Sequence, residues 1–210
     1  MPAPAATFTV RHVQLVRAAF AAIAALMITF SPDHSAEVGL AVFSGFIIAT
    51  SLVMFLAAWL VARSGGRWHY VLLGVIALMA GAASGIPPLR TTETFFVVLI
   101  SWAALSGLVE LLAGIRARRA GDPGARDQIA VAVLTLLLAV VLLVIPPAYS
   151  LAYTIEDAGE FVLTGIILGV GVFGAYAAVV AVYLAIAGLS PRRTPVQVEA
   201  PAVPDHGGVA

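Results

Sequence analysis

The chain has 210 residues, of which 61% are hydrophobic and only 10% are charged, and its net charge is zero at pH 7. Soluble domains usually carry about 25% charged residues, disordered chains are much less apolar, and nucleic-acid binders need a basic excess, so composition and charge exclude these three classes. Cysteine is absent, which also excludes disulfides, thiolate metal sites and cysteine nucleophiles.

Six long apolar runs follow one another along the chain. A helix needs about 20 apolar residues to cross about 30 Å of hydrocarbon, whereas the strands of a membrane barrel alternate in polarity. The only charges inside the runs are Arg17 and Glu110. The sequence therefore predicts an all-α polytopic membrane protein with six transmembrane helices, in residues 12–31, 38–62, 68–89, 94–115, 128–155 and 161–191.

A spacing of arginine and proline recurs three times. An Arg is followed 21 residues later by a Pro in Arg11 and Pro32, Arg67 and Pro88, and Arg126 and Pro147. Each unit would comprise a helix, a turn with proline and a returning helix, so all units would start at the same membrane side. We therefore predict three tandem parallel helical hairpins in one transmembrane domain, residues 11–189, at approximately 11–63, 67–119 and 126–189.

Arginine is distributed very unevenly between the two ends of the predicted helices. Ten of the eleven Arg residues lie at one end, and only Arg90 lies at the other. By the positive-inside rule the Arg-rich end faces the cytoplasm. We expect a multi-pass protein of the cell inner (plasma) membrane with both termini cytoplasmic: a short segment at residues 1–10 and a disordered, Pro-rich tail at 190–210.

Acidic residues collect at the opposite end. Asp157 and Glu160 have the spacing of an Asp-led helix cap, which would start the sixth helix there. Acids suit the starts of returning helices, although a pH-sensing role is the alternative. The six residues are Asp33, Glu37, Glu93, Glu156, Asp157 and Glu160.

Glu110 is the one carboxylate within a predicted span. It lies six residues before Arg116, and Arg17 lies six residues beyond Arg11, so both are about 9 Å inside the same end at 1.5 Å per residue. Gly107 shares its helical face, and small residues allow close helix approach in lipid. We predict a Glu110–Arg17 pair and favour a structural role for it, with a proton or ion site as the alternative.

Other local patterns predict packing and lipid contact. Small residues at helical spacing, Ala41-Gly45-Ala49, Gly81-Gly85 and Gly165-Gly169, are typical of helix packing. Arg116, Arg118 and Arg119 form a basic cluster that would contact anionic lipid head groups.

Enzyme motifs are missing from the sequence. The four His residues, at positions 12, 34, 69 and 206, lie away from the middle of any span, so none could serve a buried serine as a base. Their spacing to acids matches no zinc site either. We therefore expect no enzymatic activity, no cofactor and no metal.

A proline ends each predicted first helix of a hairpin, and residues 101–116 read Ser-Trp-Ala-Ala-Leu-Ser-Gly-Leu-Val-Glu-Leu-Leu-Ala-Gly-Ile-Arg. With these features the three-hairpin plan resembles the HdeD family of acid-resistance membrane proteins, and residues 101–116 look like the family's second helix of a hairpin. The resemblance covers about residues 11–189. The resemblance implies a six-span bacterial inner-membrane protein with a stress or acid-resistance role.

Two functions remain open from the sequence. One is a non-enzymatic membrane protein of the HdeD-like type that acts by packing in the lipid bilayer, as a monomer or a homo-oligomer. The alternative is a small permease or channel for a proton, ion or small solute, which needs polar groups converging at mid-membrane. Neither function involves nucleic acid.

Overall fold

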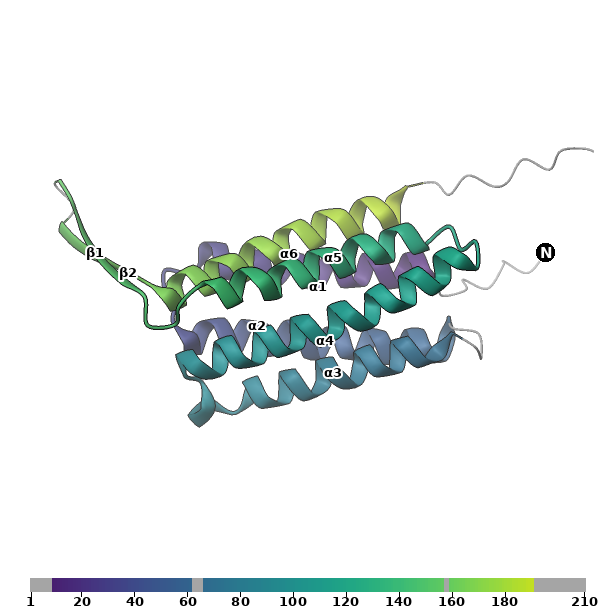
Figure 1. The fold of residues 1–210 in the computed structure, drawn as a ribbon, viewed down its shortest axis with the longest axis horizontal. Coiled ribbons are helices and arrows are strands. Elements are labelled where there is room, and N and C mark those ends of the chain that lie inside the picture. The colour runs from purple at the N-terminus through teal and green to yellow at the C-terminus, as the bar shows by residue number, and fades with distance from the viewer. Residues whose placement is uncertain (1–8, 62–65, 157–158, 191–210) are drawn as a thin grey trace, which may run out of the picture.

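The computed structural model describes residues 9–61, 66–156 and 159–190, and six long helices lie side by side in it (Figure 1). Each helix is long and apolar enough to cross a membrane, which confirms the predicted helical, six-span class. The predicted segment 1–10 and the tail 190–210 lie almost wholly outside the described residues, as does Arg63. The helices are α1 (Val10–Phe30), α2 (Ala36–Leu60), α3 (Arg67–Gly85), α4 (Thr92–Arg119), α5 (Ala125–Val144) and α6 (Gly165–Leu189).

The helix ends follow local sequence signals. The side-chain oxygens of Ser35, Thr91 and Thr164 each accept a hydrogen bond from the backbone N–H three residues later, which caps the starts of α2, α4 and α6. Pro32, Pro88 and Pro147 follow the ends of α1, α3 and α5, because proline cannot continue a helix. A short 3₁₀ turn, η1 (Pro87–Leu89), joins α3 to α4.

The helices form a closed ring of contacts. The closest pairs are α1 with α6, α2 with α3, and α4 with α5, whereas α1 with α2, α3 with α4, and α5 with α6 contact one another less. Helices α2, α4 and α6 are more buried than α1, α3 and α5, and α2 touches both α4 and α6. Three repeated hairpins would give this alternation of inner and outer helices, and the repeat itself stays a prediction.

An aromatic layer fills the centre of the bundle. Phe43 of α2, Trp102 of α4 and Phe173 of α6 meet there, with ring centroids 5.2 Å apart for Phe43 and Trp102 and 5.6 Å apart for Phe43 and Phe173. Both contacts are edge-to-face, a favoured geometry for aromatic pairs. Between this layer and the end of the bundle that carries the β-hairpin, the core is closed by fully buried side chains, including Leu40, Phe95, Leu99 and Val170.

A β-hairpin after α5 was not predicted. Strands β1 (Ser150–Ile155) and β2 (Gly159–Thr164) pair antiparallel, with Ser150 opposite Thr164, and the hairpin projects beyond the bundle (Figure 1). The predicted fifth span, 128–155, and sixth span, 161–191, were therefore too long. A short apolar run cannot be assigned to helix or strand by periodicity alone, and here Pro146 and Pro147 end the helix.

The predicted helix cap at Asp157 and Glu160 is wrong. Glu160 lies in β2 and Thr164 caps α6, while Asp157 lies outside the described residues. Two of the small-residue stripes do pack between helices: a Cβ on Gly81 would meet Ile48 of α2, and one on Gly169 would meet Phe95 of α4. Gly45 of the third stripe instead faces open space, so a Cβ there would meet no neighbouring helix.

Candidate functional site

A charged pair joins the first and fourth helices inside the bundle. Nη1 of Arg17 on α1 donates to Oε1 of Glu110 on α4 at 3.1 Å. The exposed fraction of the Glu110 side chain is 6%, and that of Arg17 is 19%. The sequence predicted this pair from equal depth on two helices, and the structure brings the two residues together; it is the one salt bridge within the described residues.

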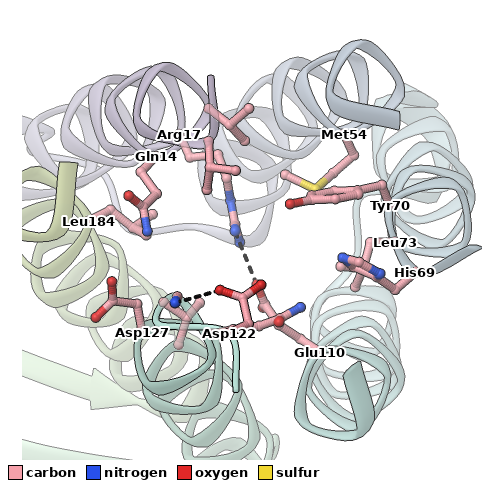
Figure 2. Close-up of a pocket in the computed structure, with 15 residues that line it drawn as sticks. Gln14, Arg17, Met54, His69, Tyr70, Leu73, Glu110, Asp122, Asp127 and Leu184 are labelled. Carbon is pink, nitrogen blue, oxygen red and sulfur yellow. Dashed lines mark hydrogen bonds and ion pairs between the residues drawn. The ribbon is translucent and has the colours of Figure 1, made fainter. Parts of the chain in front are cut away.

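A cavity of about 150 Å³ lies above the pair on the Arg-rich side, and we call it the vestibule. All six helices supply lining residues, and α2 contributes Met54 alone among the described residues. One water needs about 10–15 Å³ of such volume, so the vestibule has room for a small solute. Its polar and charged lining residues are Gln14, Arg17, His69, Tyr70, Glu110, Asp122, Asp127 and Gln128 (Figure 2).

A second cavity, the inner cavity, lies on the opposite side of the pair and extends to Trp102 of the aromatic layer. Its volume is about 30 Å³, which fits water. Arg17 and Glu110 line both cavities. Thr135 and Tyr176 also line the inner cavity, and their hydroxyl oxygens lie 2.9 Å apart in a hydrogen bond between α5 and α6.

Two buried polar atoms at these cavities have no hydrogen-bonding partner. These atoms are Oε1 of Gln14, a residue that lines the vestibule, and Oγ of Ser106, a residue that lines the inner cavity. Their residues are 8% and 6% exposed. A buried polar group without a partner costs about 1–3 kcal/mol, so both atoms retain hydrogen-bonding capacity that the described residues do not use.

The mouth of the vestibule carries two more carboxylates. Oδ1 of Asp122 accepts a hydrogen bond from the backbone N–H of Gly124 at 2.7 Å, and Oδ1 of Asp127 accepts one from the Tyr183 hydroxyl at 3.3 Å. Neither forms a salt bridge with an arginine within the described residues. With Glu110 and Arg17, the described residues that line the vestibule therefore carry a formal charge of about two negative units.

The basic cluster at the end of α4 lies outside the cavities. Arg116, Arg118 and Arg119 are exposed in the last turn of α4, where positive charge complements the helix dipole. The Arg116 guanidinium lies over the Trp68 ring, 5.0 Å from its centroid. Contact of the three residues with anionic lipids stays a prediction.

Sequence reasoning missed most of the cavity lining. Gln14 and Tyr70 each lie among apolar neighbours near a helix start, and Asp122 and Asp127 looked like ordinary loop and cap residues. One available signal was that Asp122 and Asp127 are the only acids between the fourth and fifth predicted spans, 94–115 and 128–155. Within the described ranges, no three His, Asp or Glu side chains group closely enough to hold a metal ion.

The fold and site define a multi-pass membrane protein with a charged site at the foot of an open cavity. Six apolar helices surround the site, and a lipid bilayer is the environment that suits their exposed surfaces. Comparisons with known protein families, curated proteins and solved structures found no match to the chain.

Proposed function

We propose that the protein is a small permease in which Glu110 carries a proton or small ion between the vestibule and the inner cavity. One observation supports this function above others: Arg17 and Glu110 together separate two cavities and line both. An ionisable group inside a membrane is expensive, and such groups commonly mark ion pathways. This function is the second of the two that the sequence left open, and it involves no enzymatic step.

The geometry of the pair supports an exchangeable rather than a fixed contact. Only one oxygen–nitrogen contact is made, at 3.1 Å, whereas the most specific Arg–carboxylate pairs are bidentate. The vestibule provides space into which Arg17 can withdraw when Glu110 takes up a proton. The closed apolar core beyond Trp102 would make Glu110 accessible from one side of the membrane only in this conformation.

The access side is proposed to be the cytoplasm. The vestibule opens at the end of the bundle where α1, α3 and α5 begin, and that end carries most of the arginine. The positive-inside rule then supports cytoplasmic termini, and the inner (plasma) membrane is the membrane that we propose. Arg116, Arg118 and Arg119 would contact anionic lipid heads at that surface.

A non-enzymatic, stress-related role of the HdeD-like type is the second candidate. The direct contact of Arg17 with Glu110 favours it, because a paired charge can serve helix packing alone. Under this proposal the bacterial protein acts through its fold, as a monomer or a homo-oligomer, and the resemblance of residues 101–116 to the family is its other support.

Proton flux into liposomes separates the two candidates. Purified protein is reconstituted with a pH-sensitive dye inside, and a potassium diffusion potential drives protons inward. We expect flux above protein-free liposomes for the wild type, flux at the protein-free level for Glu110→Gln, and wild-type flux for Glu93→Gln. Glu93 is the matched control, because it is an exposed carboxylate in the first turn of the same helix. Wild-type flux no greater than that of protein-free liposomes would refute the permease.

A further inference from the structure

We propose that the vestibule binds a small guanidinium-type cation between the Asp122 and Asp127 carboxylates and the side-chain carbonyl of Gln14. This inference deepens the proposed function, on which it rests, by naming a ligand class for the same cavity. All three residues line one cavity of about 150 Å³. Figure 2 shows them around the opening, with the Arg17–Glu110 pair beside them.

The charge of the vestibule favours a cation. Glu110 is already neutralised by Arg17, and among the described residues the only other charged side chains lining the cavity are Asp122 and Asp127. Within the described residues neither aspartate has an arginine partner, although Arg116, Arg118, Arg119 and Arg126 lie at the same end of the bundle. Carboxylates within low-dielectric walls concentrate the field and attract counter-ions.

An independent observation supports a ligand with N–H donors. Gln14 lines the vestibule and is only 8% exposed, and its Oε1 is buried and accepts no hydrogen bond from the described residues. A bound donor would satisfy this acceptor, whereas a cation without N–H groups would leave it unpaired at the usual cost.

One guanidinium group is already part of the vestibule wall. The Arg17 guanidinium donates to Glu110 within the same cavity wall, and the planar guanidinium fork matches carboxylate geometry. The Tyr70 and His69 rings also line the vestibule, and aromatic faces attract such cations. A ligand with several N–H donors could thus contact the two aspartates and Gln14 in turn.

Equilibrium dialysis of the detergent-purified full chain with radiolabelled guanidinium tests the inference. We expect saturable binding that equimolar tetramethylammonium and sodium do not displace, because those cations cannot donate to Gln14. A charged hydrogen bond contributes about 1.5–3 kcal/mol, and 1.4 kcal/mol is tenfold in affinity. Asp122→Asn and Asp127→Asn should therefore each raise Kd by about tenfold or more, and Gln14→Leu should also weaken binding.

The control variant is Glu160→Gln, an exposed carboxylate in β2 at the opposite end of the bundle, and it should bind guanidinium like the wild type. Each variant is checked for native helicity and for a monodisperse elution profile. Gln14→Glu adds a negative charge and keeps the side-chain length, so it should bind guanidinium more tightly. A gain in affinity at this position would show that the loss in Gln14→Leu reflects a lost contact and not a loss of folding.

The outcomes separate this inference from the permease. If guanidinium does not bind, or if tetramethylammonium displaces it equally well, the guanidinium site is refuted. Glu110-dependent proton flux in the same protein would still support the permease. Binding that depends on Asp122, Asp127 and Gln14, without Glu110-dependent flux, would retain the site and overturn the permease.

Discussion

Removing either partner of the Arg17–Glu110 pair should destabilise the protein, and the two losses should be coupled. At 3.1 Å two unit charges attract by about 5 kcal/mol at an effective dielectric constant of about 20, but desolvation offsets much of that attraction. Breaking a fully buried pair costs about 3–5 kcal/mol. Because 19% of the Arg17 side chain is exposed, we expect a smaller loss for Glu110→Ala, about 1–3 kcal/mol.

A double-mutant cycle on detergent-purified protein measures this coupling. Glu110→Ala leaves Arg17 buried without its partner, and Arg17→Met leaves Glu110 in the same situation, so each single variant should melt at a lower temperature. The double variant should recover part of the loss, with a coupling of at least about 0.5 kcal/mol in the free energy of unfolding. If the two losses add to within about 0.3 kcal/mol, the pair does not stabilise the fold and our reasoning is refuted.

Three further predictions concern orientation and packing. A reporter enzyme active only in the periplasm should be active when fused after Asp157 and inactive when fused after Asp122, and the reverse pattern would invert the proposed orientation. Gly107→Val should lower the free energy of unfolding by about 1–3 kcal/mol in thermal melts. A Cβ at Gly107 would lie 2.7 Å from a leucine side chain and 3.2 Å from the backbone of α5. Gly45 faces open space, so the free energy of unfolding of Gly45→Ala should lie within about 0.5 kcal/mol of the wild-type value. Gly159→Val should speed proteolysis of the β-hairpin and leave the helical melt unchanged, because a φ of 99° is strained for a β-branched residue, whereas equal proteolysis rates would show that the turn tolerates the side chain.

The sequence determined the membrane class and most helix positions, because a span needs a long apolar run that composition reveals directly. Proline after three of the helices marked their ends, and Ser35 and Thr91 have the residue types that cap helix starts. Glu110 and Arg17 could also be paired in advance, since their distances from the charged helix ends correspond to the same depth.

Only the tertiary structure decided which polar residues share a cavity. Gln14, Tyr70, Asp122 and Tyr176 are far apart in the chain, and they line the two cavities because the ring of helices brings α1, α3, α6 and the α4–α5 loop together. The β-hairpin likewise depends on pairing between two short segments, and local periodicity cannot distinguish such apolar segments from helix. Apolar patterning specifies burial in lipid or protein, whereas the convergence of side chains depends on how the helices pack.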